Sequence, residues 1–301
     1  MRIKSKKVKV GMSDKVFDNI IMVILTMLLL VVLYPIIYVI SASFSSGSAI
    51  STGKVVLWPV EACVTGYKIV FATQKIWSGY ANSILFAVVG TFLNLIMNTL
   101  AAYPMSRKDF WARKFLNTFF LIPMFFGGGM IPHYIVASKL GLVNSRWGFL
   151  VLTGGISIYN MILIRTYFQS SIPGELLEAA KMDGITDFKY LMTIVVPLSK
   201  PIFSVIMLYH LVGHWNSYME PLIYLRKNEY HTLQMVVKQI ISKSNIAASE
   251  LTDVSAMVEA ASSVDVMKYA LIVVATLPML IIYPFILKFF EKGVMVGSLK
   301  G

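Results

Sequence analysis

Residues 20–40 read IIMVILTMLLLVVLYPIIYVI, an apolar run of 21 residues that contains no charge. At 1.5 Å per residue, a helix of this length crosses the apolar core of a bilayer, which is about 30 Å thick. A basic segment ending at Lys15 precedes the run and the small residues Ser41 to Ser43 follow it, which is also the order of a signal peptide. Because the apolar part of a signal peptide is usually only about 7–15 residues long, we interpret the run as a retained membrane span.

Five further apolar runs follow, at residues 83–103, 115–136, 147–167, 201–222 and 266–290. In the whole chain, 57% of the 301 residues are hydrophobic, 14% are charged, and the mean hydropathy is +0.71. A water-soluble domain does not expose so much apolar surface. The sequence therefore predicts an all-α, polytopic membrane protein with six transmembrane helices in a domain over residues 20–290.

The net charge of +12 lies largely between the apolar runs. Basic residues gather before residue 20, at 107–114, at 181–200 and after residue 287. The positive-inside rule then places the N-terminal segment 1–19 and the C-terminal tail 291–301 in the cytoplasm. Arg226 and Lys227 would lie on the outer side of the membrane, against this rule, but they belong to a long loop, where charges count for little. We assign the charge to membrane topology and expect no nucleic-acid partner.

Two outer segments, residues 44–79 and 223–265, are long enough to form small structures of their own. The second contains five apolar residues at helical spacing, which form one face: Leu233, Val236, Val237, Ile240 and Ile241. This helix either docks a partner or rests on the bilayer or on the other spans.

The loop between the fourth and fifth runs, residues 168–200, has the start and stop signals of two short helices. Pro173 suits the first turn of a helix, and Gly184 can supply the left-handed residue that ends it. A second helix is expected from Thr186, with four apolar residues on one face: Phe188, Leu191, Met192 and Val195.

In the first of these helices, Leu176, Ala179 and Ala180 share a face. The two alanines would let another protein's surface approach the backbone closely, and Glu178 offers a charge beside them. Such a surface suits docking into a cleft.

Six residues of this loop match a known pattern in order and spacing: Glu178, Ala179, Ala180, Gly184, Ile194 and Pro197. The chain thereby resembles the binding-protein-dependent ABC importer permeases, whose EAA loop has this pattern. The resemblance implies the type I importer permease fold. It also implies that the loop is a coupling helix, which seats in a groove of a cytoplasmic ATPase subunit and transmits its opening and closing to the spans.

Three other stretches are similar to the carbohydrate-uptake branch of that family, and more narrowly to its maltose-type oligosaccharide and polysaccharide permeases: residues 128–132, 213–217 and 293–301. The resemblance implies a transmembrane permease subunit for sugars or oligosaccharides. In maltose-type relatives the C-terminal tail reaches between the ATPase subunits, so the resemblance implies the same for residues 293–301.

The resemblance also implies partners. The chain would form a heterodimer with a second permease in the lipid of the bacterial cell (cytoplasmic) membrane, joined by two ATPase subunits and an extracytoplasmic solute-binding protein. No G-x-x-x-x-G-K-[ST] loop occurs in the sequence, so the ATPase subunits would bind ATP and Mg²⁺. We expect no cofactor and no catalytic residue on this chain.

Three consecutive glycines, residues 127–129, lie between Pro123 and Pro132 in the third run. This combination should break a helix inside the membrane, where unwound backbone is tolerated only against protein or a water-filled path. Gly128 and Gly129 are therefore candidates for the conduit wall or a gate. A packing kink, with another helix close to the glycines, is the alternative.

The fifth run contains side chains that lipid disfavours, ending with Glu220. Imidazoles and amides can hydrogen-bond sugar hydroxyls, and aromatic faces can cover sugar rings. The candidate translocation path therefore consists of His210, His214, Trp215, Asn216 and Tyr218. Hydrogen bonding to the partner permease explains these residues equally well, and Asn94 and Asn98 fit the same kind of interhelical bond. We expect no metal site, because the glutamate of H-E-x-x-H is absent.

Two other functions remain as alternatives. An ion-coupled carrier would place acidic residues within its spans, and only Glu220 comes close. An intramembrane enzyme would need a nucleophile motif such as G-x-S-x-G, which the sequence lacks. Copurification of an ATPase that binds the Glu178 loop separates the importer from both.

Overall fold

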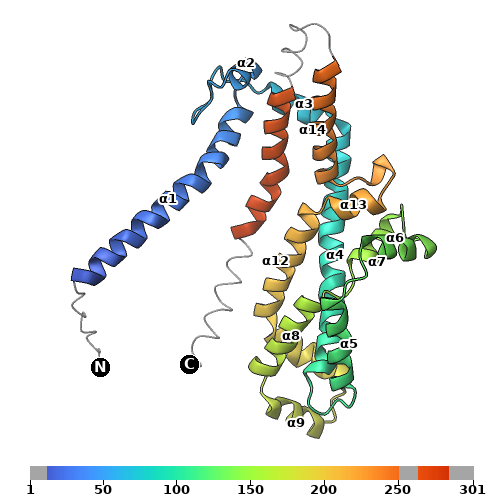
Figure 1. Cartoon of the computed structure of the whole chain (residues 1–301). Helices are drawn as coiled ribbons and strands as arrows, with labels where there is room; N and C mark the ends of the chain where they lie inside the picture. Colours follow the sequence, from blue (N-terminus) through green and yellow to red (C-terminus); the bar gives the residue numbers. More distant parts are fainter. Residues whose placement is uncertain (1–11, 251–263, 285–301) are drawn as a thin grey trace. The chain divides into compact units, whose positions relative to one another are not determined.

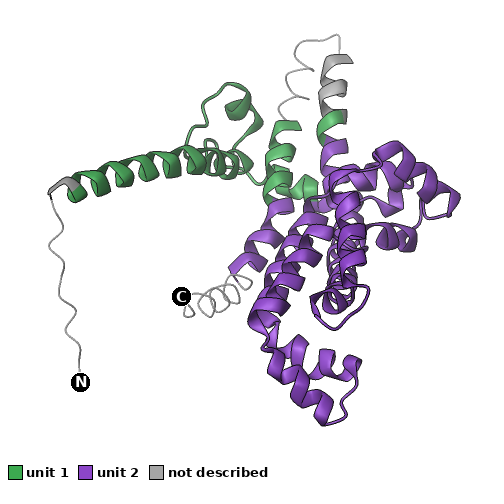
Figure 2. Cartoon of the chain, turned by 60° about the horizontal axis from the view of Figure 1, so that its bottom comes forward, with its two compact units in different colours: residues 1–70, 241–273 green, residues 71–240, 274–301 purple. Residues whose placement is uncertain are grey.

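The computed structural model describes residues 12–250 and 264–284, and within them every regular element is a helix (Figure 1). The chain divides into two compact units, one of residues 1–70 and 241–273 and one of residues 71–240 and 274–301 (Figure 2). We call them unit 1 and unit 2 and describe each by itself. The predicted all-α class is confirmed.

Three helices are each long and apolar enough to span a membrane: α1 (Met12–Ser43), α4 (Gln74–Ser106) and an unlabelled helix over Val264–Pro284. Three further candidates are bent pairs. If each bent pair is one span, the described residues hold six spans, as the sequence predicts.

The third run is broken where the sequence predicts a break. Helix α5 (Arg113–Phe125) ends before the three glycines, and α6 (Met130–Lys139) leaves them at an angle of 115°. The fourth run is also broken, which we did not predict. Helices α7 (Arg146–Thr153) and α8 (Ile158–Ser171) meet at 52° across Gly154 and Gly155, the local signal that sequence reasoning missed.

The fifth run is shorter than the predicted 201–222, because α12 (Lys200–Asn216) ends at Asn216 and α13 (Met219–Tyr224) starts a new helix. Before it, α10 (Asp187–Tyr190), a π-helical turn (Leu191–Val195) and α11 (Val196–Leu198) form a helix bent from α12 by 81°. Residues 285–290 of the sixth run and the tail 291–301 lie outside the described residues.

Unit 1 contains α1, α2 (Gly47–Ser51) and most of α3 (Thr65–Ala72). Part of the segment 44–79 contributes here to a small buried cluster of Ala42, Ala49, Ile50, Val55 and Val266. The α1 side chains from residue 14 to residue 36 are all exposed. Their apolar surface suits lipid or another apolar helix.

In unit 2, α4 is the central helix and packs against both α12 and α8. One cluster of buried side chains joins the last turns of α4 to α8 and to the π-helical turn through Met105, Ile164 and Leu191. A second cluster, at the other end, joins α4 to α7 and α13 through Phe86, Phe149 and Tyr224.

Helix α14 (Leu233–Glu250) follows a short 3₁₀ turn (Asn228–Tyr230) and starts with the apolar face that the sequence predicts. Leu233 and Val236 are buried, and both approach Gly79 of α4. This end of α14 therefore rests on another span of its own unit, which was one of the two alternatives.

Candidate functional site

Helix α9 (Gly174–Met182) projects at one end of unit 2 (Figures 1 and 2). Its C-terminus is closed by Gly184, which has a φ of 68°. The Gly184 amide donates to the Lys181 carbonyl at 3.1 Å and the Ile185 amide to the Ala180 carbonyl at 2.9 Å. These are the two hydrogen bonds of a Schellman motif, so the predicted left-handed end at Gly184 is confirmed.

The side chains of α9 divide between an inner and an outer face. Ala180 is 3% exposed and packs with Tyr190 and the half-buried Leu177 in the buried cluster. Glu178 and Ala179 are exposed, and Met182 is 89% exposed. The expectation that Ala180 shares an outward face with Leu176 and Ala179 is therefore wrong. Its small side chain lets α9 lie against its own unit.

The second helix also differs from its prediction. Leu191 and Val195 are buried, whereas Phe188 and Met192 are exposed. Tyr190 is buried beside Leu191, and Ile194 is half-buried beside Val195, which is ordinary helical spacing. The face that packs on the buried cluster is therefore turned away from Phe188 and Met192. Ile194 is half-buried against the cluster and Pro197 is exposed in α11.

A group of ion pairs, absent from the sequence predictions, connects α9 to the end of α4. Arg107 donates through Nε to Oδ1 of Asp109 at 2.9 Å and through Nη2 to Oδ2 at 2.6 Å. Lys181 of α9 donates to the same Oδ2 at 2.8 Å, and Arg107 also pairs with Asp187 at the start of α10. We call these four residues the Arg107 cluster.

Burial and charge both favour the ion pairs of the Arg107 cluster. The Arg107 side chain is only 12% exposed, so its charge needs partners. Arg107, with Lys181, holds the pKa of the Asp109 carboxyl well below its usual range, and Asp109 raises the pKa of Arg107. Sequence reasoning counted Arg107 only as a topology charge. The signal it missed is Asp109, a lone acid in the basic segment 107–114.

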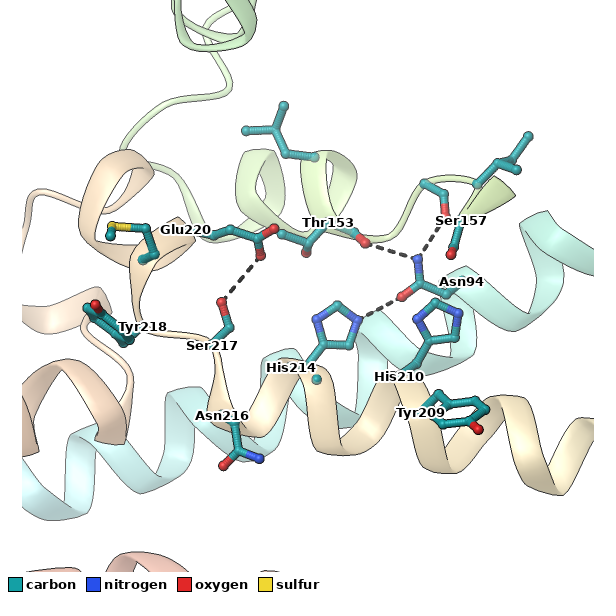
Figure 3. Close-up of a pocket in the computed structure, with 15 residues that line it drawn as sticks. Asn94, Thr153, Ser157, Tyr209, His210, His214, Asn216, Ser217, Tyr218 and Glu220 are labelled. Atoms are coloured by element: carbon teal, nitrogen blue, oxygen red, sulfur yellow. Dashed lines mark hydrogen bonds between the residues drawn. The ribbon is translucent and has the colours of Figure 1, made fainter. Parts of the chain in front are cut away.

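A cavity of about 580 Å³ lies in unit 2 between α4, the α7–α8 break and the end of α12 (Figure 3). Its polar lining consists of Asn94, Thr153, Ser157, Tyr209, His210, His214, Asn216, Ser217, Tyr218 and Glu220. The cavity thus brings together His210, His214, Asn216 and Tyr218, four of the predicted path residues.

Two asparagines of α4 hold the α7–α8 break. Asn94 donates through Nδ2 to the carbonyls of Thr153 and Gly155, at 2.9 and 2.7 Å. Oδ1 of Asn98 accepts the Ser157 amide at 2.9 Å. The unwound backbone is satisfied in this way by side chains of a neighbouring helix, which is the condition for its stability in a membrane.

The two histidines of α12 bond to the same asparagines. Since the Asn94 amide nitrogen faces two carbonyls, its Oδ1 is the acceptor for Nε2 of His214, at 2.7 Å. Asn98 Nδ2 and Asn160 Nδ2 both lie near Nε2 of His210, at 3.3 and 3.0 Å. That nitrogen therefore accepts hydrogen bonds. The imidazoles bond to helices of their own chain, a third possibility beside substrate and partner permease.

Three predicted path residues lie elsewhere. Trp215 is 3% exposed, and its Nε1 donates to the carbonyl of Ala275 at 3.2 Å, on the side of α12 away from the histidines. Gly128 and Gly129 lie in the α5–α6 break, are exposed and do not line the cavity. In this structure the Trp215 side chain therefore packs between helices and does not line the cavity.

Residues 95–296 match the family model described as the binding-protein-dependent transport system inner membrane component. This match covers more than half of the chain. The chain belongs to this family. Its members are the non-catalytic, membrane-spanning permease subunits of ABC importers, so this protein is such a permease.

Two curated relatives show what the permease resembles. A polygalacturonan/rhamnogalacturonan transport system permease protein of Bacillus subtilis is 35% identical over 96% of this chain and 100% of its own length. A galactooligosaccharides transport system permease protein of the same species is 27% identical over 92% of this chain and 94% of its own length.

Among solved structures, a chain of a bacterial ABC transporter involved in the import of the acidic polysaccharide alginate aligns with a TM-score of 0.85. It is 32% identical, and the alignment covers 94% of this permease and 100% of that chain. The predicted type I importer permease fold is confirmed. The alternatives of an ion-coupled carrier and an intramembrane enzyme receive no support.

Proposed function

We propose that this permease is one half of a heterodimeric, ATP-driven importer of oligosaccharides. A solute-binding protein delivers the glycan to the outer face, and two ATPase subunits bind ATP and Mg²⁺ on the cytoplasmic face. The support is the family match together with relatives whose names specify oligosaccharide or polysaccharide transport.

The outer face of α9 is the ATPase-docking surface in this proposal. The observation that supports this surface is that Met182 is 89% exposed and lies next to the exposed Glu178 and Ala179. These residues belong to a helix that is not long enough to span the membrane. A methionine left uncovered in this way fits an apolar pocket of a partner, and the small Ala179 allows close approach. The N-terminal and C-terminal segments lie on the same cytoplasmic side.

The cavity is the part of the translocation path that this chain contributes. Asn216 and Tyr218 have polar groups available to a glycan, whereas His210 and His214 maintain the cavity wall through their bonds to α4. Movement of the spans between inward-facing and outward-facing arrangements would open the cavity to alternate sides.

The substrate in this proposal is an acidic oligosaccharide. Two relatives that exceed 30% identity across nearly the whole chain are described with polygalacturonan/rhamnogalacturonan and with alginate. Uptake by cells that express the complete transporter should therefore be greater for oligogalacturonides than for neutral galacto-oligosaccharides. The reverse preference would reject the acidic class and leave the importer assignment intact.

The docking surface is tested by affinity purification of the tagged permease from detergent-solubilised membranes. Glu178→Arg should lower recovery of the ATPase by at least about fivefold, because a reversed charge at a buried interface is costly. The matched control is Glu229→Arg, an exposed acid in the 3₁₀ turn beyond α13, which should leave recovery unchanged. Equal recovery of ATPase with both variants would reject α9 as the docking helix.

A further inference from the structure

Helix α9 touches the rest of unit 2 in two chemically different ways. Its inner face packs through Ala180 into the buried cluster. Lys181, which is half exposed, bonds to Asp109 in the segment that follows α4. Apolar packing is non-directional and keeps α9 close, whereas a charged hydrogen bond restrains how α9 can turn.

Asp109 is the centre of this attachment. Both of its carboxylate oxygens accept from Arg107, in the two-pronged geometry that fixes orientation, and Oδ2 also accepts from Lys181. Arg107 is the C-cap residue of α4 and is largely buried, so the carboxylate is held firmly relative to α4. The phenolic oxygen of Tyr103, one turn earlier, bonds to Arg107 at 3.2 Å and to the Asp187 carbonyl at 3.3 Å.

The other link is α4 itself. Asn94 lies 13 residues before Arg107 in the same helix, about 20 Å away at 1.5 Å per residue. Asn94 and Asn98 bond to the α7–α8 break and to the histidines of α12. One continuous helix therefore connects the attachment of α9 to the wall of the cavity.

We propose that Asp109 is a positioning residue for coupling: by joining Lys181 of α9 to Arg107 of α4, it passes movement of α9 to the cavity wall. The inference rests on the proposed docking of an ATPase at α9. It adds a route from that surface to the cavity, through residues that lie outside the EAA pattern.

The test uses the complete transporter in detergent or liposomes. Cys63 is replaced by Ser, and a reporter cysteine is introduced by Met219→Cys in the cavity lining. The rate of its reaction with a maleimide is measured without nucleotide and with ATP and vanadate. A change in the rate reports that nucleotide at the ATPase has altered the cavity, and it needs no knowledge of the substrate.

We expect Asp109→Asn and Lys181→Met each to reduce the nucleotide-dependent change in labelling rate by about threefold, while ATPase recovery stays normal. The double variant should be no worse than either single variant, because both remove the same bridge. Lys181→Arg keeps the bridge and should restore the change. Lys189→Met is the matched control, since this exposed lysine of α10 forms no ion pair within the described residues.

Three outcomes decide the inference. The expected pattern, with restoration by Lys181→Arg, supports it. A normal response in Lys181→Met, an exposed position where misfolding is not expected, overturns it and leaves the proposed function standing. If the tagged permease without substitutions recovers no ATPase, the proposed function and this inference are both overturned.

Discussion

Nε2 of His214 donates to Oδ1 of Asn94 across 2.7 Å, and the same imidazole lies against Gly90 one turn earlier in α4. A Cβ on Gly90 would stand 2.9 Å from Nε2 and 3.2 Å from two ring carbons of His214. The hydrogen bond therefore requires a residue without a side chain at position 90, and several experiments follow from this contact and its neighbours.

Gly90→Ala should destabilise the permease by about 1–3 kcal/mol, because the methyl group would push α12 away from α4. Thermal unfolding of the purified complex measures the change. Gly213→Ala is the matched control, since a Cβ at this helical position meets no atom within 4 Å. Combining Gly90→Ala with His214→Ala should remove part of the loss. An unchanged melting temperature for Gly90→Ala alone would mean that α12 does not approach α4 at Gly90 as closely as these distances require.

Asn94→Ala should destabilise the protein by about 1–3 kcal/mol, because the carbonyls of Thr153 and Gly155 lose their donor. Thr91→Val is the control on the same helix. The buried Thr91 hydroxyl has no hydrogen-bond partner within the described residues, so replacing it with a methyl group should be neutral or stabilising. Chemical or thermal unfolding of both variants checks this contrast, and equal losses would contradict it.

Gly184→Ala should lower recovery of the ATPase partner in affinity purification. The left-handed φ of 68° costs a residue with a Cβ about 1–2 kcal/mol, so the end of α9 and the position of Glu178 should shift. Gly174→Ala, at the start of the same helix and without a left-handed φ, controls for added bulk. If both variants bind the ATPase equally, the Schellman end is not needed for docking.

Trp215 and Tyr218 should differ in what they affect. Trp215→Phe removes the donor to Ala275 and should lower stability by about 1 kcal/mol without changing substrate preference. Tyr218→Ala, in the cavity lining, should lower uptake without a comparable loss of stability. Unfolding and uptake measured on both variants distinguish a packing residue from a residue of the translocation path. A change of substrate preference in Trp215→Phe would show that Trp215 belongs to the path.

The Asp109 bridge should not depend on pH across the physiological range. The depressed pKa of Asp109 means that its contribution is fully present above the unfolded pKa of about 3.9 and is lost only as pH falls through the lower folded value. The effect of Asp109→Asn on nucleotide-dependent labelling should therefore be equal at about pH 5.5 and about pH 8. An effect confined to the higher pH would show that Asp109 is protonated near pH 5.5.

The sequence by itself determined that the protein lies in lipid, that its fold is all-α and which family it belongs to. Apolar runs such as residues 20–40 are decided by length and composition, and both are local properties. The left-handed end at Gly184 and the break at residues 127–129 were predictable for the same reason, because glycine and proline act on their own backbone. The order of Glu178, Ala179, Ala180 and Gly184 indicated the family without any knowledge of packing.

Only the tertiary structure decided which side each polar residue faces. Trp215 and His214 are adjacent in sequence, yet one packs toward Ala275 and the other bonds to Asn94, because neighbouring residues of a helix point about 100° apart. Leu191 is buried and its neighbour Met192 is exposed because the buried cluster packs on one side of this helix, and the pairing of Asp109 with Lys181 joins residues 72 positions apart. Periodicity gives the face of an isolated helix, but a partner helix and an ion pair exist only once the chain has packed.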